Sequence, residues 1–138
     1  MAEFLADKSA LTRRDTRPEV RAVVEPLLLA GRIATCSVID LELLFSARGP
    51  AGYAALASAL QGMPRVAMSE PIMERALAIQ AELAAVSQHR SVSLPDLLVA
   101  ACAEHHGLTV LHYDTDFDRV AAITGQPTRW VVAQGTVS

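Results

Sequence analysis

The sequence has few lysines and few cysteines, and it contains no long apolar run. Of its 12 basic residues, 11 are arginine, and Lys8 is the only lysine. No uncharged stretch is both long enough to span a bilayer and free of glycine and proline. The N-terminal residues MAEFLADKSA also lack the basic and then apolar segments of a secretion signal. We therefore expect a cytoplasmic protein with no membrane anchor.

The two cysteines, Cys36 and Cys102, lie far apart in the sequence and in apolar surroundings. This placement argues against a disulfide framework and predicts two small buried thiols. With 51% apolar and 20% charged residues, the composition is not that of a disordered chain. The length of 138 residues predicts a single domain over residues 1–138, large enough to bury a core.

The charges are unevenly distributed along the chain, although the net charge is only −3. Arginine presents a planar group that binds phosphate or carboxylate, so the excess of arginine suits an anionic partner. Aspartates instead alternate at positions 114, 116 and 118. An acidic centre beside a basic flank is what a metal-dependent phosphodiester enzyme needs, but ordinary surface charge gives the same counts. Five arginines fall in the first quarter of the chain: Arg13, Arg14, Arg17, Arg21 and Arg32.

Short apolar segments alternate with helical patterns along the whole chain, which indicates an α/β domain around a small parallel sheet. Ligand sites in such sheets form beyond the carboxyl ends of the strands, where Asp7 and Asp114 both stand. Strands are expected at residues 3–6, 32–36, 65–68, 109–113 and 130–132. Helices are expected after Asp7 and over residues 18–29, 37–47, 49–62, 69–87, 94–106 and 118–123.

Several of these boundaries depend on capping residues and on proline. Ser37 is expected to cap the helix that it opens, and Pro26 is expected to bend the helix that contains it. Ser93 and Asp96 have the spacing of a capping box at the start of the 94–106 helix, which Gly107 would end.

Glu42 stands out because of its position on the predicted 37–47 helix. At 100° per residue it falls between Val38, Ile39 and Phe45, in the middle of the apolar arc. A carboxylate there is costly unless a cation meets it, so Glu42 is either a metal ligand or the acid of a buried salt bridge to an arginine. Asp40 points about 160° away and has a sufficient role near the start of the helix, so we expect it outside any site.

The other candidate acids each have a simpler structural interpretation as well. Asp7 suits a turn or a helix cap, although the Ser9 hydroxyl could orient its carboxylate. Asp96 suits the start of a helix, yet that helix is apolar on nearly all sides and should be buried. Asp114 and Asp116 follow a strand and, two residues apart in a loop, can face one cation. Carboxylate oxygens suit Mg²⁺ or Mn²⁺.

Other known sites fit the segment DTDFD poorly. A calcium loop of the EF-hand kind would need glycine and an acid where Arg119 and Gly125 stand. A haloacid-dehalogenase-like phosphatase would need Thr or Val at Asp118, and a phosphoacceptor receiver domain would need a lysine late in the chain. Zinc could be bound by four residues: Cys102, His105, His106 and His112. However, these residues fit the end of a helix and the strand after it, and that explanation is stronger than a zinc site.

Four motifs in order resemble the PIN-domain nucleases, and more narrowly the VapC toxins of bacterial toxin-antitoxin pairs. They are D-x-S-A-L after the first strand, V-x-x-x-E in a helix, L-P-D-x-L-x-A-A at the start of a late helix, and V-L-x-x-D-x-D-F-D after a strand. The resemblance covers essentially the whole chain. It implies an α/β fold with three layers, in which helices flank a small central parallel sheet.

The resemblance also implies a function and the residues that perform it. It implies an endoribonuclease that uses Mg²⁺ or Mn²⁺ on structured RNA such as tRNA or rRNA, forms a homodimer and is inhibited by a VapB-like antitoxin. Lys8 departs from the threonine found in many members. The implied metal and catalytic residues are Asp7, Glu42, Asp96 and Asp114, with Asp116 as a supplementary ligand and Ser9 as a supporting hydroxyl. Contacts to RNA or antitoxin are expected from Lys8, Arg13, Arg14 and Arg17. A solvated helix face is an equal alternative for the three arginines, and Lys8 could instead pair with a neighbouring carboxylate.

Two other functions stay open from the sequence. The acids could serve a non-catalytic module that binds metal or RNA without cutting it, or the protein could be a small metal-dependent phosphatase or phosphoacceptor domain. Metal-dependent cleavage of RNA separates the nuclease from the first, and turnover of a small phosphomonoester would support the second.

Overall fold

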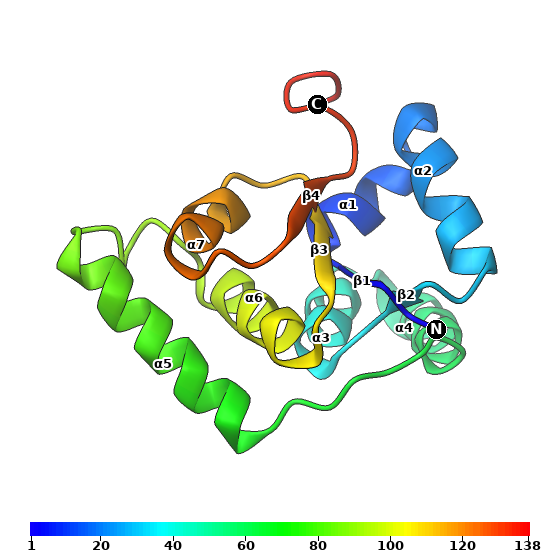
Figure 1. The fold of residues 1–138 in the computed structure, drawn as a ribbon. Helices are drawn as coiled ribbons and strands as arrows, with labels where there is room; N and C mark the ends of the chain where they lie inside the picture. The colour runs from blue at the N-terminus through cyan, green and yellow to red at the C-terminus, as the bar shows by residue number, and fades with distance from the viewer.

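The computed structural model describes all residues, 1–138, and has a four-stranded parallel sheet at its centre (Figure 1). The strand order is β2-β1-β3-β4, so β1 and β3 are the two central strands. The strands are β1 (Phe4–Ala6), β2 (Ile33–Ala34), β3 (Thr109–His112) and β4 (Thr128–Trp130). The expected α/β architecture around a small parallel sheet is therefore confirmed.

Helices cover both faces of this sheet and make the three layers. Figure 1 shows α5, α6 and α7 on one side of the sheet and α1 and α2 on the other. The helices are α1 (Lys8–Leu11), α2 (Pro18–Leu29), α3 (Ser37–Phe45), α4 (Gly49–Gln61), α5 (Glu70–Ala85), α6 (Leu94–His106) and α7 (Asp116–Thr124), with a 3-10 turn, η1 (Thr12–Arg14), after α1. None of them is long and apolar enough to cross a bilayer.

Two apolar clusters lie on opposite faces of the sheet, because successive side chains of a strand point to opposite sides. In β1, Leu5 joins the larger cluster, whereas Phe4 joins the smaller one. In β3, Val110 and Leu111 divide in the same way. The larger cluster is built mainly with α5, α6 and α7, and the smaller one with α1 and α2.

The α6 helix forms for the reasons that its sequence indicates. The Ser93 hydroxyl accepts a hydrogen bond from the Asp96 backbone N–H at 3.3 Å, which caps the first turn. Gly107 follows the helix with a φ of 67°, a left-handed conformation that glycine adopts at little cost. Cys102, within α6, is fully buried, as is Cys36, and both are free thiols as expected.

Two of the expected strands are wrong or displaced. Residues 65–68 form no strand, because only Arg65 pairs with the edge strand region, in an isolated bridge to Thr35. The last strand is β4 and not residues 130–132. It is placed by its pairing with β3, in which Thr128 lies opposite Val110 and Trp130 lies opposite His112.

Two helical details, at the starts of α3 and α7, also differ from expectation. Cys36, not Ser37, is the N-cap residue of α3, and no side chain caps that helix. The α7 helix begins at Asp116, two residues earlier than expected. Pro26 lies within α2 without ending it. It is on the exposed face, so water can reach the carbonyl that a proline leaves unpaired.

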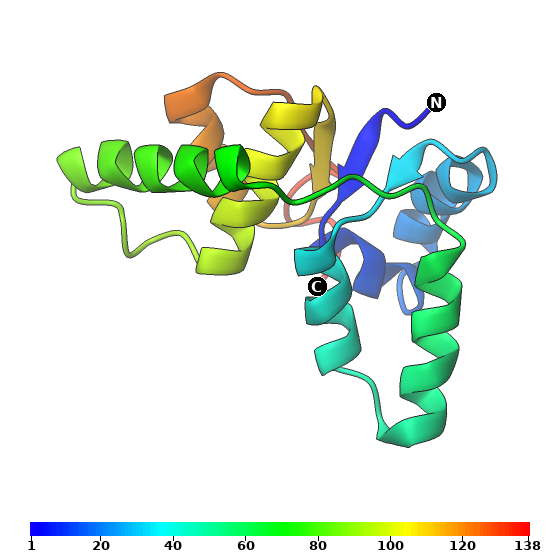
Figure 2. The same ribbon diagram turned by 90° about the horizontal axis from the view of Figure 1, so that it is seen from below.

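Figure 2 shows α3 and α4 extending together as a pair of helices away from the sheet. One end of α3 stays at the sheet, where its N-terminal half packs on α6. This arrangement brings the middle of α3 close to the carboxyl ends of the strands.

Candidate metal centre

The carboxyl ends of β1 and β3 bring two of the predicted acids to one edge of the sheet. The strands are parallel, with Ala6 opposite Leu111, so both end at the same edge. Asp7 follows β1 directly, and its backbone N–H donates to the Leu111 carbonyl at 2.9 Å. Asp114 lies two residues beyond the end of β3. The topology of the sheet therefore places these acids side by side.

Helices α3, α6 and α7 complete the acidic cluster with one residue each. Glu42 comes from the middle of α3, Asp96 from the first turn of α6, and Asp116 from the first residue of α7. Carboxylate oxygens lie within 4.8 Å of one another in two groups that share Asp96: Asp7, Glu42 and Asp96, and Asp96, Asp114 and Asp116. All five acids predicted to form the site are thus brought together.

Asp7 caps a helix and also has a carboxylate oxygen available to a ligand, and its sequence position allowed both roles. Its Oδ2 accepts the backbone N–H of Ser9 at 2.9 Å and so caps α1. Its Oδ1 is buried and has no hydrogen-bond partner, in a residue that is only 2% exposed. Burial raises the pKa of Asp7, and hydrogen bonds from Ser9 oppose that rise. One oxygen therefore serves the fold while the other remains available.

Glu42 is in a similar position, with one oxygen paired and one free. Its Oε2 lies 3.6 Å from the Nζ of Lys8, and its Oε1 is buried without a partner. The expected alternative, a salt bridge to an arginine, is wrong because the cation is Lys8. Burial is the main cause that raises the pKa of Glu42, followed by the charge of Asp7, while Lys8 opposes both.

Asp96 is buried beneath the cluster and has the most perturbed carboxyl. Burial is the main cause that raises the pKa of Asp96, to about 9, and the neighbouring carboxylates of Asp116, Asp7 and Asp114 raise it further. The capping box is only half formed, because the Ser93 backbone N–H donates to Asp116 Oδ2 at 3.0 Å. The Asp96 carboxyl is therefore left to face the other acids.

Asp114 and Asp116 are held by hydrogen bonds at the start of α7. Asp114 Oδ1 accepts the Asp116 backbone N–H at 2.9 Å. Asp116 uses both oxygens, because Oδ1 also accepts from Arg119 Nη1 at 3.1 Å while Oδ2 accepts from Ser93. Asp116 thus joins α7 to the start of α6.

Asp40 lies outside both acidic groups, on the side of α3 where the helix phase placed it. Thr35 Oγ1 donates to Asp40 Oδ1 at 2.6 Å, and Arg65 forms an ion pair with Oδ2. These contacts join α3 to the isolated bridge at the edge of the sheet.

The Ser9 hydroxyl supports the site from the side of the strands. Its Oγ accepts the Tyr113 backbone N–H at 2.9 Å, which joins α1 to the end of β3. Arg13 donates to the Ser9 carbonyl at 2.7 Å and lies 4.6 Å from the Tyr113 ring centre. Arg17 contacts the Ser138 hydroxyl.

Arg14 differs from Arg13 and Arg17 because its partners are acidic. It lies within 3.6 Å of Asp15 and 3.9 Å of Glu25. The Lys8 side chain is 42% exposed at the edge of the acidic cluster. Of the four basic residues expected to bind RNA or antitoxin, Lys8 alone therefore touches a member of the acidic cluster.

Sequence reasoning missed His112 as a neighbour of the site. This residue is fully buried, packs against Phe117 and Trp130, and accepts the Asp114 backbone N–H on Nδ1 at 3.2 Å. Burial lowers its pKa, which favours the neutral ring that this bond requires. Its place in a buried strand, two residues before Asp114, was the available signal. The residues weighed for zinc do not converge, since His106 Nε2 instead contacts the Ala67 carbonyl.

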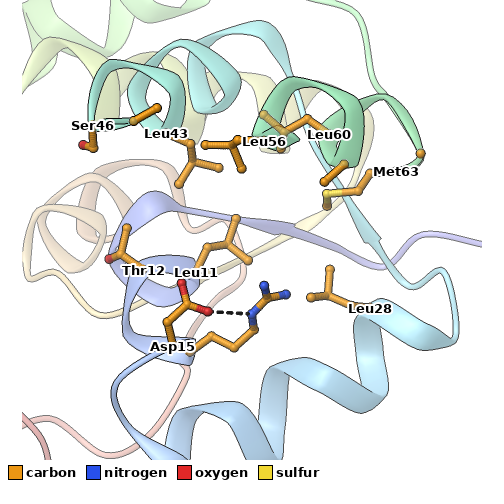
Figure 3. Close-up of a pocket in the computed structure, with 13 residues that line it drawn as sticks. Leu11, Thr12, Asp15, Leu28, Leu43, Ser46, Leu56, Leu60 and Met63 are labelled. Atoms are coloured by element: carbon orange, nitrogen blue, oxygen red, sulfur yellow. Dashed lines mark ion pairs between the residues drawn. The ribbon is translucent and has the colours of Figure 1, made fainter. Parts of the chain in front are cut away.

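An apolar groove of about 490 Å³, also not predicted, lies between α1, η1 and α2 on one side and the α3–α4 pair on the other (Figure 3). Leucines from both sides line it, among them Leu11, Leu28, Leu43 and Leu60. Figure 3 shows these side chains facing one another across the groove, with Asp15 and its ion pair at the lower side.

The donor set of the acidic cluster fits a hard divalent cation. All of its donors are carboxylate oxygens, which Mg²⁺ and Mn²⁺ prefer, and two of them are buried without any partner. Buried polar atoms are normally paired, so these two oxygens suit a positively charged ligand. Neighbouring carboxylates that repel one another point to the same need.

The sequence is similar to a known domain family and to known proteins. The family model of the PIN domain matches residues 6–123. Ribonuclease VapC51 of Mycobacterium tuberculosis is 47% identical over 135 residues, which cover 98% of this chain and 97% of the relative. Ribonuclease VapC21 of the same species is 46% identical over 134 residues, covering 96% of each chain.

Solved structures share the fold at lower sequence identity. The DNA-bound VapBC structure from Salmonella typhimurium matches with a TM-score of 0.74 and 19% identity, covering 96% of this chain and all of that one. VapBC2 from Rickettsia felis, bound to a promoter DNA fragment, gives a TM-score of 0.73 and 15% identity over 92% of this chain and 98% of that one. The motifs, the layered fold and these matches agree, and the chain belongs to the PIN-domain family, within the group of the VapC ribonucleases.

Proposed function

We propose that this protein is a metal-dependent endoribonuclease toxin that hydrolyses phosphodiester bonds in structured RNA of the tRNA or rRNA class. One observation carries the proposal: the buried carboxylate cluster leaves Asp7 Oδ1 and Glu42 Oε1 without partners at the carboxyl edge of the sheet. The relatives named as VapC ribonucleases support the same activity. We propose that residues 1–138 act as one nuclease domain, in the cytoplasm, where RNA is found.

Mg²⁺ or Mn²⁺ is the proposed cofactor. When bound, the ion would activate the attacking water and neutralise charge on the phosphate. Asp7, Glu42 and Asp96 would hold it through the first acidic group, and Asp114 would add an oxygen from the second. The fixed hydrogen bonds of Ser9 to Asp7 and of Asp116 to Asp114 keep these carboxylates in place before any ligand arrives.

Basic residues beside the cluster are the proposed contacts for RNA phosphates or for acidic groups of an antitoxin. Lys8 lies at the edge of the site, and Arg13, in η1, reaches the Ser9 carbonyl of α1. Arg17 contacts the Ser138 hydroxyl, and Arg14 lines the apolar groove together with its partner Asp15. Cationic side chains in these positions would hold the RNA backbone near the carboxylates.

The proposed protein partner is a VapB-like antitoxin. Solved relatives of this fold are VapBC complexes, such as the toxin-antitoxin complex from Klebsiella pneumoniae, although these are similar in structure more than in sequence. The groove of about 490 Å³ has the size and apolar lining for an apolar segment of such a partner. Its position next to α1 and α3 would let a bound segment continue toward the acidic cluster.

A homodimer is also proposed, through the face formed by α5 and α6. Met73, Leu77 and Leu94 are exposed there around a shallow hollow that is almost entirely apolar. Contiguous exposed apolar side chains of this kind mark surfaces that another protein covers. A second copy of the same chain would cover both hollows through one two-fold interface.

The test is incubation of purified protein with total RNA in the presence of Mg²⁺, Mn²⁺ or EDTA, followed by mapping of the new RNA ends. We expect a few discrete cuts in tRNA or rRNA that require the divalent ion. Binding of RNA without cleavage would instead indicate a non-catalytic module. Hydrolysis of p-nitrophenyl phosphate in place of RNA would indicate a phosphatase.

A further inference from the structure

Two cations bracket the acidic cluster, one at each end. Lys8 lies against Glu42, and Arg119 lies against Asp116. No cation pairs with Asp7, Asp96 or Asp114, which lie between them. When ionised, the five carboxylates carry a formal charge of −5, which the two cations reduce to −3.

The two ends of the cluster differ in what they leave available to a ligand. At the α7 end, both oxygens of Asp116 are already hydrogen-bonded, to Arg119 and to Ser93. At the α1 end, Lys8 contacts only Oε2 of Glu42 at 3.6 Å, and Oε1 stays unpartnered beside the unpartnered Oδ1 of Asp7. The two buried carboxylate oxygens without a partner thus both lie at the α1 end, next to Lys8.

The charge that remains suits a single divalent ion. One such ion brings the formal charge of the cluster and its two cations from −3 to −1, whereas two would make it positive. A second ion at the α7 end would also share Asp116 with Arg119 and Ser93, each of which already donates a hydrogen bond to one of its oxygens. Both considerations favour one ion on the side of Asp7, Glu42 and Asp96.

Lys8 is the only lysine in the chain, and a lysine pairs with a carboxylate differently from an arginine. Elsewhere in the chain, Arg75 grips both oxygens of Glu104, at 2.6 and 3.2 Å. Such a two-point contact at Glu42 would take both of its oxygens out of reach of a metal. The compact ammonium of Lys8 contacts one oxygen loosely and leaves the other for a cation.

We propose that Lys8 is a resident counter-cation of the metal centre, which keeps Glu42 Oε1 free while lowering the affinity of the centre for its single divalent ion. The inference rests on the proposed metal-dependent function. It follows from the like charges of the ammonium and a metal ion. Lys8 contacts one oxygen of Glu42, and the other oxygen would be available to the ion. Lys8 also reduces repulsion among the acids when no metal is bound.

The test is calorimetric titration of the metal-free full-length protein with MnCl₂ at low ionic strength. We expect the wild type to bind one Mn²⁺ per chain. Lys8→Met should bind it at least tenfold more tightly, and Lys8→Arg at least threefold more weakly, because arginine would hold both oxygens of Glu42. Arg48→Met removes the same charge from an exposed residue with no ion pair, and it should leave the Kd within twofold of the wild type.

The outcomes separate this inference from the proposed function. An unchanged or weaker Kd for Lys8→Met, or two Mn²⁺ ions per wild-type chain, would overturn the inference and leave metal dependence intact. No uptake by either protein would overturn both. Thermal unfolding of each metal-free variant establishes that it is folded, and Lys8→Gln replaces Lys8→Met if the latter is not.

Discussion

Asp7 and Glu42 each use one carboxylate oxygen locally and leave the other buried without a partner. For Asp7 the local role is the cap of α1, and for Glu42 it is the pair with Lys8. An unpaired buried acceptor costs stability, so its retention at two adjacent residues is best explained by a ligand that completes both. A structural role and a binding role are therefore not alternatives at these positions.

The neighbours Asp40 and Glu42 allow a matched test of this interpretation. Glu42→Gln should weaken Mn²⁺ binding and remove RNA cleavage, because it takes a charge from the open position. Asp40→Asn should retain both, and it should cost about 1 kcal/mol of stability through its contacts with Thr35 and Arg65. Titration with Mn²⁺ and a cleavage assay on both variants measure this. The reverse pattern would move the site to the Asp40 side of α3.

The raised pKa values of the buried acids predict how stability depends on pH. Burial raises the pKa of Asp7 and Glu42, and that of Asp96 to about 9. A carboxyl with a higher pKa in the folded state than in the unfolded state binds protons better when folded. The metal-free protein should therefore lose stability as the pH rises from about 4 to about 9.

Thermal unfolding in EDTA at several pH values measures this dependence. Asp96→Asn should raise the melting temperature at pH 8 and flatten the slope, whereas Asp118→Asn, in the same segment but outside the cluster, should keep the wild-type slope. Saturating Mn²⁺ should restore stability at high pH, since the ion favours ionised carboxylates. A stability that rises between about pH 4 and about pH 9 would be inconsistent with the raised pKa values of these acids.

At the scale of elements, the sequence was most informative where one strand or helix determines its own limits. Ser93 and Gly107 mark the ends of α6 in the sequence and in the structure. The carboxyl ends of β1 and β3 could also be predicted. Asp7 follows β1 directly, and Asp114 follows β3 within two residues. These strand ends placed Asp7 and Asp114 at one edge of the sheet from the sequence alone, whereas Asp96 was assigned to the same site through the family resemblance.

Elements that depend on a neighbour were less predictable. The apolar residues at 131–132 resemble a strand, yet β4 ends at Trp130 because its pairing with His112 sets the register. Residues 65–68 have strand-like composition, but β2, beside them, is only two residues long and offers little to pair with. The partners of Glu42 and Asp116 depend on side-chain packing across elements, which periodicity does not reveal.

The start of α6 provides a test at this scale. Ser93→Ala removes the hydroxyl that accepts the Asp96 N–H, and it should cost about 1 kcal/mol of stability. Ser93→Thr should cost much less, because it retains the hydroxyl. Because the Ser93 backbone N–H still reaches Asp116, both variants should keep the Mn²⁺ stoichiometry of the wild type. Denaturant unfolding and calorimetry are the measurements, and equal stability of the two variants would show that this cap contributes nothing.

At the scale of the whole molecule, a negative net charge coexists with a basic flank beside the metal centre. Replacing Arg13, Arg14 and Arg17 by alanine should weaken RNA binding and flatten its dependence on salt, because fewer counterions are released. The exposed arginines Arg48 and Arg90 provide the control, and their replacement should leave the slope unchanged. Binding measured across a salt series decides this, and equal slopes for both variants would assign the three arginines to structural contacts alone.

The central claim is that the buried carboxylates are the catalytic metal site of a ribonuclease. The most direct measurement is the initial rate of tRNA cleavage in Mg²⁺ for the wild type, Asp7→Asn and Asp118→Asn, each shown to be folded. Asp118 lies near the cluster but accepts from the Trp130 indole, outside both acidic groups. We expect cleavage by the wild type and Asp118→Asn, its loss in EDTA, and at least a hundredfold reduction in Asp7→Asn, about 2.7 kcal/mol of activation free energy. Wild-type rates in Asp7→Asn, or cleavage that persists in EDTA, would contradict the account.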